Sequence, residues 1–317
     1  SGEAAHSLQN VNNSYSGPAI EVRRSSDNAT MNINFDANGN LDVTALTSFA
    51  GSGDAFVRTW YDQSGNGHNF LQTNNNAQPL VVKNGALITQ NGEAVIQLDG
   101  ANDYLIANTL DLTQNIELTA FSVWGTQETV KDQLRAFSQW PDDILLDGNS
   151  DGSINFLKGS PITRTGNLFI VPGSDNITSF GISGSTLFLN NNGQSATSAV
   201  VSTSFSGSAF TIGAEENGSR ADQNSRMFVK EFIGFITDEF ADRILVEQYQ
   251  SAKWGVELTP PGSRSDEAAK AMASIQKGDA QDGFSNFTVS YLERLSETAD
   301  IDLQVSDSIK LDLQGDT

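Results

Sequence analysis

The feature that most constrains this chain is a long series of short strand-like segments separated by tight-turn dipeptides. Asn-Gly and Asp-Gly pairs supply the positive φ angles that two-residue hairpin turns require. Many short strands joined by such turns are typical of an antiparallel sandwich or barrel. The dipeptides are Asn66-Gly67, Asn84-Gly85, Asn91-Gly92, Asp99-Gly100, Asp151-Gly152 and Asn192-Gly193.

Periodicity divides the chain into predicted strands with a few helices. Near the N-terminus, a helix is expected over 4–11 and a strand over 19–23. Asp42 is a predicted cap for a short helix that ends at Gly51, and Thr237 for a longer helix over 238–252. The remaining predicted strands are 56–61, 79–82, 94–98, 118–124, 133–138, 153–157, 168–171, 178–182, 186–190, 208–212 and 227–236.

A break at Pro260-Pro261-Gly262-Ser263 predicts the boundary of the main domain. We therefore expect a β-sandwich over 1–258 and an acidic C-terminal extension over 259–317, which serves as an assembly or linker segment. Within this extension, residues 266–276 are expected to be helical. Residues 284–295 and 301–313 alternate in places like strands.

The charge balance and the absence of cysteine exclude several classes of protein. The chain has 39 acidic and 18 basic residues, a net charge of −21, so it lacks the basic stripe that nucleic acid or an anionic membrane surface attracts. With no cysteine and two histidines, disulfides, thiolate zinc sites and three-histidine metal sites are excluded. No apolar run approaches the roughly 20 residues that span a bilayer.

Four segments near the N-terminus are more specific than composition. They are AAHSL at 4–8, SYSGPA at 14–19, VRRSSDN at 22–28 and TWYDQSGNGH at 59–68. Together they resemble the catalytic domain of the α-L-arabinofuranosidase B family, and similar segments occur in phage tail-fibre and other virion proteins. The resemblance implies an all-β, concanavalin- or lectin-like antiparallel sandwich (jelly roll), with a few short helices and a small C-terminal extension.

The catalytic residues of that family carry over only in part. Its general acid is an Asp after Ile-Gly-Gly, and here Ile212-Gly213-Ala214 is followed by Glu215 and Glu216. Its nucleophilic Glu precedes Asn-Leu-Phe, but Gly166 precedes the matching segment at 167–169. The family's disulfide between adjacent cysteines is also absent. The resemblance therefore implies either a sandwich that has lost the catalytic activity, or a hydrolase that uses Glu215 or Glu216 with an unidentified partner residue.

The segment after the predicted strand at 56–61 is the densest polar and aromatic loop in the chain. Its amide, carboxylate and imidazole groups can hydrogen-bond sugar hydroxyls, while an aromatic ring stacks on a sugar face. The other interpretation, which we favour, is a strand entering the core followed by a glycine-shaped turn. The candidate ligand-binding residues are Trp60, Tyr61, Asp62, Gln63, Asn66 and His68.

A second polar loop has the spacing of the first half of a calcium loop. Asp147, Asn149 and Asp151 match D-x-N-x-D-G, but Lys158 occupies the position where a bidentate Glu is expected. A hairpin turn explains the same residues, and we favour it. Calcium is the one cofactor that the sequence suggests.

From these observations we expect a non-catalytic structural or glycan-recognition module. The predicted setting is a phage virion (tail fibre, head fibre or decoration protein) or an extracellular or cell-surface location. Its expected partners are a cell-surface or extracellular glycan and further copies of the chain or a larger virion assembly, with no nucleic acid and no membrane insertion. The alternative is a secreted α-L-arabinofuranosidase-like glycoside hydrolase.

Overall fold

The structure is a computed structural model that confirms the predicted all-β architecture. It describes residues 3–112, 117–127, 134–141, 144–149, 152–158, 163–200, 207–215, 225–239 and 242–258, with three short strands beyond them. Within this part of the chain the strands pair antiparallel. No helix among these residues has the length and apolar character needed to cross a membrane.

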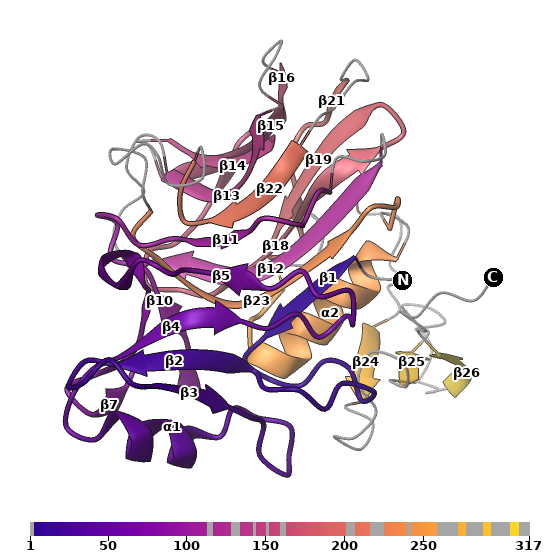
Figure 1. Cartoon of the computed structure of the whole chain (residues 1–317). Helices are drawn as coiled ribbons and strands as arrows, with labels where there is room; N and C mark the ends of the chain where they lie inside the picture. The colour runs from indigo at the N-terminus through magenta and orange to yellow at the C-terminus, as the bar shows by residue number, and fades with distance from the viewer. Residues whose placement is uncertain are drawn as a thin grey trace.

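The strands form two layers that face each other across one core (Figure 1). The front layer runs through β3, β2, β4, β5, β11, β22, β13, β14 and β15, with β16 and β17 beside β15. Their bounds are Thr30–Ile33, Ile20–Arg24, Ala55–Trp60, Phe70–Leu71, Leu105–Ala107, Gly207–Ile212, Leu134–Pro141, Ile144–Gly148, Ser153–Lys158, Thr163–Arg164 and Leu168–Phe169.

The back layer is centred on β23, which pairs with β1 and β10 on one side and with β12 on the other. β18 and β19 continue this layer to the short strands β20 and β21. β6 pairs with both β4 and β10 and so connects the two layers. The bounds are β1 Ala4–Ser7, β6 Leu80–Lys83, β10 Ile96–Gln97, β12 Leu118–Thr126, β18 Asn176–Ser183, β19 Thr186–Asn191, β20 Gln194–Ser195, β21 Ala199–Val200 and β23 Met227–Phe235.

Aromatic rings fill the space between the layers. Phe232 of β23 lies 5.5 Å from Phe137 and 4.8 Å from Phe210, measured between ring centroids. Phe137 also meets Trp124 edge to face at 5.8 Å. Such geometries add to the free energy that burial of each ring supplies, so the alternation of large apolar residues along each strand holds the layers together.

Three of the predicted Asn-Gly turns close tight hairpins. In Asn84-Gly85, Asn91-Gly92 and Asn192-Gly193 both residues have positive φ, between 48° and 82°. That is the backbone of a type I′ turn, whose twist matches that of the flanking strands. These turns join β6 to β7 (Ala86–Leu87), β8 (Thr89–Gln90) to β9 (Glu93–Ala94), and β19 to β20.

The short helix was predicted correctly and the longer one begins later than expected. α1 covers Val43–Ala50, with the Asp42 side chain accepting the Ala45 N–H, and it ends at Gly51. α2 covers Arg243–Trp254, not 238–252. Thr237 does not cap it, because its hydroxyl donates to Glu239 while the Glu239 N–H donates to Thr119. α2 packs on the outer side of β12 and β23, with Val246 against Phe121 and Ile233. A single 3-10 turn, η1, lies at Asn75–Ala77.

The prediction of a helix over 4–11 is wrong. Residues Ala4–Ser7 form β1, which pairs with β23 in the register Ala4↔Gly234. All four residues are buried, and His6 lies 4.5 Å from the Phe70 ring. A small apolar segment at the chain start gains more from pairing with a buried strand than from a free helix of eight residues.

Beyond residue 258 the structure describes only β24 (Met272–Gln276), β25 (Thr288–Leu292) and β26 (Val305–Lys310), which form an antiparallel sheet. The strands predicted within 284–295 and 301–313 are confirmed for 288–292 and 305–310. The helix expected over 266–276 is wrong for 272–276, because these residues pair with β25, and residues 266–271 lie outside the described residues. The domain boundary at 258 stays a prediction.

Candidate functional site

The loop that follows β4 was the first candidate for ligand binding, and the structure shows what each of its side chains contacts. The Trp60 ring is fully buried, 5.6 Å from His6 and 6.3 Å from Phe70 between centroids. A ring with no exposed surface is not available to stack on a sugar. Tyr61 is partly exposed, and its hydroxyl donates to Asn32 at 2.9 Å.

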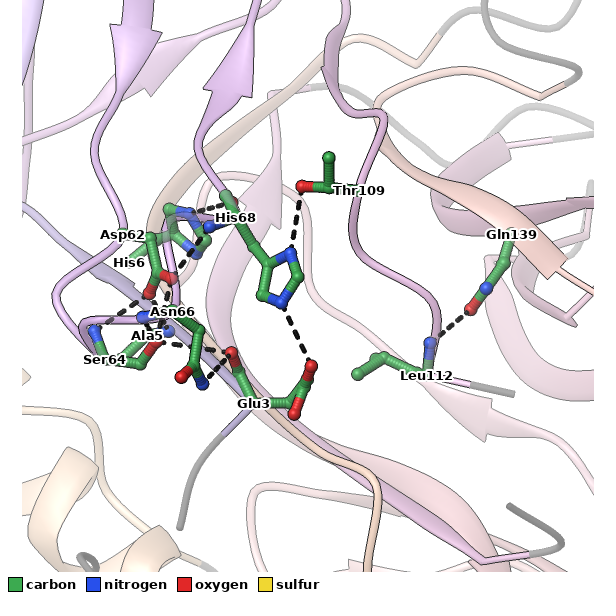
Figure 2. Close-up of polar contacts among 10 residues, drawn as sticks. All are labelled: Glu3, Ala5, His6, Asp62, Ser64, Asn66, His68, Thr109, Leu112 and Gln139. Atoms are coloured by element: carbon green, nitrogen blue, oxygen red, sulfur yellow. Dashed lines mark hydrogen bonds and ion pairs between the residues drawn. The ribbon is translucent and has the colours of Figure 1, made fainter. Parts of the chain in front are cut away.

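The Asp62 carboxylate organises the turn itself (Figure 2). It accepts the backbone N–H groups of Ala5 at 2.9 Å, Ser64 at 2.9 Å and His68 at 3.0 Å, and the Ser64 hydroxyl at 2.8 Å. Burial alone raises the pKa of Asp62, but the charge of His6 and these hydrogen bonds outweigh it, so the pKa lies below its ordinary value. Asp62 therefore stays ionised as the centre of a structural turn.

Gln63 and Asn66 fasten the same loop to the N-terminal strand. The Gln63 side chain is fully buried, accepts the Val11 N–H at 2.9 Å and donates to the Ser7 carbonyl at 2.9 Å. Asn66 donates to the Glu3 carbonyl at 2.9 Å. These contacts support the structural interpretation of the loop.

The two histidines meet where β1 passes this loop, with the His6 ring against the backbone of His68 (Figure 2). His6 Nε2 donates to the His68 carbonyl at 3.0 Å, so its Nδ1 carries no proton and, among the described residues, has no hydrogen-bond partner. Burial lowers the pKa of His6 to about 4, although Asp62 opposes this shift. His68 lies between Glu3 Oε1 at 3.0 Å and the Thr109 hydroxyl at 2.9 Å. Both rings thus connect β1 to the front layer.

A second cluster, on the outer face of the front layer, contains Glu215. Arg135 of β13 donates from Nε to Glu215 and from Nη1 to Asp147 of β14, so the two carboxylates meet on one guanidinium. All three side chains are about nine-tenths buried, with 11%, 9% and 8% exposure. We call Arg135, Asp147 and Glu215 the carboxylate cluster.

The backbone around β13 and β22 holds Glu215 in this place. β22 pairs with β13 in the register Phe137↔Ile212, and the Gly213 N–H donates to the Ala136 carbonyl at 3.0 Å. The Ser138 hydroxyl donates to the Ala214 carbonyl at 2.7 Å. The residue after this turn therefore arrives beside Arg135. Glu216, the other predicted catalytic residue, lies outside the described residues.

Neighbouring strands add polar groups to the same face. Arg164 Nη1 lies 3.5 Å from the second oxygen of Asp147. Asn155 of β15 is the register partner of Asp147, and its buried Oδ1 accepts no hydrogen bond from the described residues. Burial raises the pKa of Asp147, with Arg135 and Arg164 opposing it. The cluster thus combines two acids, and burial raises the pKa of one of them, Asp147, above its ordinary value.

Sequence reasoning found Glu215 but not its partners. Arg135 stands in an otherwise apolar stretch, Leu134 to Phe137, where a charged residue requires a buried partner. Asp147 was assigned to a calcium loop, yet its carboxylate pairs with Arg135. The signal for the cluster was therefore a single charged residue in each of two apolar strands, Arg135 and Asp147. Their spacing in the sequence does not show that they pair.

The calcium prediction falls on a hairpin. The Asn149 N–H donates to the Ser153 carbonyl at 2.8 Å, and the Gly152 N–H donates to the Asn149 carbonyl at 3.0 Å. Asp151 lies outside the described residues. Among the residues that the structure describes, no group of three His, Asp or Glu side chains is arranged to hold a metal ion. Calcium binding stays a prediction.

Comparison with known proteins gives a sequence match and a structural match. Residues 2–117 match the family "Alpha-L-arabinofuranosidase B, catalytic". No curated protein sequence matches the chain. The sequence match covers the N-terminal strand and the Asp62 loop but not the carboxylate cluster.

Solved structures of the same kind of enzyme share the fold. A mutant of a GH54 α-L-arabinofuranosidase, soaked with 4-nitrophenyl α-L-arabinofuranoside, has a TM-score of 0.59 and 14% identity, covering 94% of this chain and 73% of that one. A GH54 α-L-arabinofuranosidase soaked with a cyclic sulfate inhibitor has a TM-score of 0.58 and 15% identity over the same shares. An arabinofuranosidase complexed with arabinofuranosyl-α-1,2-xylobiose has a TM-score of 0.52 and 12% identity, covering 94% and 72%.

At these identities the structural match shows the fold, a two-layered sandwich shared over most of the chain. The sequence match adds a resemblance in the first 117 residues. This chain therefore resembles the α-L-arabinofuranosidase B catalytic domain in its N-terminal sequence and in its fold.

Proposed function

We propose that the domain binds and hydrolyses α-L-arabinofuranosyl groups of an extracellular glycan, and that the carboxylate cluster is its active site. The observation that carries this proposal is the meeting of Asp147 and Glu215 on Arg135, at the outer face of a sandwich shared with arabinofuranosidases. The comparisons fit this hydrolase alternative better than the virion module expected from the sequence.

Two nearby carboxyl groups suffice for hydrolysis with retention. One carboxylate attacks the anomeric carbon to form a covalent glycosyl-enzyme, while the other, protonated, donates its proton to the departing oxygen. Water, deprotonated by the second group, then displaces the first carboxylate and releases the sugar; the separation of the two groups in such enzymes is about 5–5.5 Å. The raised pKa of Asp147 suits the proton donor, because burial favours its neutral form. Glu215 is then the nucleophile. This assignment is opposite to the one implied by its position after Ile212-Gly213-Ala214.

Arg135 has to release one carboxylate for this chemistry. A guanidinium that pairs with both acids stabilises their charged forms, and a proton donor needs the neutral form. Substrate hydroxyls that enter the site can take over one of these hydrogen bonds. Arg135 is therefore a positioning residue for both acids in this proposal.

The second candidate is a glycan-binding module without turnover. It is favoured by the same salt bridges, because Arg135 occupies both carboxylates in the structure. In this case the outer face of the front layer recognises sugar but performs no reaction. A virion or cell-surface setting and assembly with further copies remain proposals that accompany this second candidate.

The test is turnover of 4-nitrophenyl α-L-arabinofuranoside by the whole chain and its variants. We expect D147N and E215Q to lower kcat by about 100-fold or more, the usual effect of losing an acid, base or nucleophile. D36N is the matched control, since the Asp36 carboxylate lies in an exposed turn. Azide added to E215G should restore turnover and yield a glycosyl azide of inverted configuration, whereas azide with D147G should yield the retained one.

Each outcome separates the candidates. Turnover that survives in both D147N and E215Q contradicts the proposed site. Binding of an arabinose-bearing polysaccharide without turnover by the wild-type chain supports the second candidate. A wild-type chain that shows no binding and no turnover contradicts both candidate functions.

A further inference from the structure

We propose that Phe169 is a stacking platform for a sugar ring of the polysaccharide backbone, on the same sheet face as the carboxylate cluster. The inference rests on the proposed function and deepens it. It states that Phe169 adds affinity for an arabinosyl group attached to a longer chain, beyond the affinity for a small glycoside. The residue belongs to β17, beside β15 at the end of the front layer.

Strand register places Phe169 and the cluster on one face. Asp147 is opposite Asn155 in the β14–β15 pair, and Phe169 is opposite Ser153 in the β15–β17 pair. Ser153 and Asn155 are two residues apart on β15, so they point to the same side of the sheet. The intervening Ile154 and its partner Leu168 belong to the core. Phe169 therefore projects from the outer face, as Asp147 does.

The exposure of Phe169 is unusual for its residue type. Its side chain is 67% exposed, whereas the preceding Leu168 is 8% exposed. Val171, the next outward position along the chain, is 64% exposed and extends the apolar surface. Phe169 and Val171 thus expose apolar surface on the same side of the sheet.

Sugar rings match this surface chemically. The face of an aromatic ring is electron-rich and attracts the polarised C–H bonds that line one face of a pyranose. The ring itself is rigid and requires little ordering on binding. A neutral backbone sugar also suits a chain with net charge −21, which repels acidic ligands at long range.

The distance between the two sites fits a substituted polysaccharide. Two strand spacings and two residues along the strand separate Asp147 from Phe169, which corresponds to about 12 Å between backbones. One arabinosyl group does not extend that far, but a group attached to a backbone of several sugars does. An arabinose at the carboxylate cluster therefore leaves backbone sugars near Phe169.

The variants F169A and F169W test the inference, with V200A as a matched control. Val200 is 78% exposed, but it pairs with Thr186 at one end of β19, whereas the Phe169 carbonyl accepts from Asn191 at the other end. Affinity for arabinoxylan is measured by native electrophoresis in gels that contain the polysaccharide. Turnover of 4-nitrophenyl α-L-arabinofuranoside is measured in parallel, and thermal unfolding shows that each variant is folded.

We expect F169A to weaken the affinity for arabinoxylan about tenfold and to leave kcat/KM for the aryl glycoside unchanged. F169W and V200A should bind as the wild type does. Equal binding by F169A and the wild type overturns the inference and leaves the proposed function intact. A wild-type chain that neither binds arabinoxylan nor cleaves the aryl glycoside overturns the proposed function.

A second copy of this chain is the competing occupant of the surface. If F169A changes the concentration dependence of the sedimentation coefficient and does not change the affinity for arabinoxylan, the face is a self-association surface and the inference is wrong.

Discussion

The Asp62 carboxylate accepts the backbone N–H of Ala5 at 2.9 Å, joining two residues that lie 57 positions apart in the chain. The same carboxylate closes its own loop through Ser64 and His68. One buried acid thus fixes both the turn after β4 and the first strand of the back layer. A motif that resembled a ligand site therefore stabilises the fold in this structure.

Replacement of Asp62 by alanine should strongly destabilise the protein. The change leaves buried N–H donors without an acceptor, at about 1–3 kcal/mol each, so we expect the free energy of unfolding to fall by about 3 kcal/mol or more. Urea unfolding followed by tryptophan fluorescence measures this loss. D36A is the control, because the Asp36 carboxylate accepts two N–H groups in an exposed turn and its loss should have an effect of about 1 kcal/mol or less. Equal losses in the two variants contradict the central role of Asp62.

His6 should make the protein less stable as the pH falls from 6.5 to about 4. Its pKa is about 4 in the folded chain, against an ordinary value of 6.5, so between these values the unfolded chain binds a proton that the folded chain does not. The stability that His6 contributes should therefore decline across this window by up to about 3 kcal/mol. H6F has no such group, and its stability relative to the wild type should improve as the pH falls. Parallel curves for the two proteins contradict this assignment.

Asp103 should have the opposite pH dependence. Burial, reinforced by the charge of Asp99, raises the pKa of Asp103 from 3.8 to about 7. Between these values the folded chain holds a proton that the unfolded chain has released, so stability falls as the pH rises from about 4 to 7. D103N keeps an oxygen to accept the Asp99 N–H, and its stability relative to the wild type should grow by up to about 4 kcal/mol over this range. A difference between the two proteins that does not vary with pH is the contradicting result.

The salt bridge between Glu231 and Lys253 should matter far more than an exposed one. Glu231 is fully buried on β23 and accepts from Lys253 at 2.6 Å, from Trp254 at 3.2 Å and from Gln250 at 3.0 Å, which holds α2 against the back layer. K253M leaves this carboxylate without its cation, and we expect a loss of about 3 kcal/mol or more in thermal or urea unfolding.

The exposed pair of Arg24 and Asp27 provides the comparison for K253M. Its side chains are 33% and 48% exposed, so solvent screens the pair and D27N should lower stability far less than K253M does. If K253M is as stable as D27N, water must reach Glu231 and the network does not hold α2.

Local patterns in the sequence predicted most of the strands because each depends on near neighbours. The Asn84-Gly85 and Asn192-Gly193 turns form where the dipeptides occur, since their positive φ angles are a property of the residues themselves. Asp42 caps α1 for the same reason, with its acceptor three residues from the donor. By contrast, residues 4–7 became a strand because β23, more than 200 positions away, offers a partner.

The candidate site followed the same division. Glu215 was identified from the residues before it, but Arg135 and Asp147 were not connected to it, since 80 positions separate Arg135 from Glu215. The sequence by itself determined a cysteine-free, acidic, all-β chain with hairpin turns in defined places, because composition and turn propensity act locally. Only the tertiary structure decided that backbone N–H groups of the protein itself occupy the Asp62 carboxylate, and that two distant acids share one guanidinium. Those outcomes depend on strand order and register, which bring together side chains that no local spacing relates.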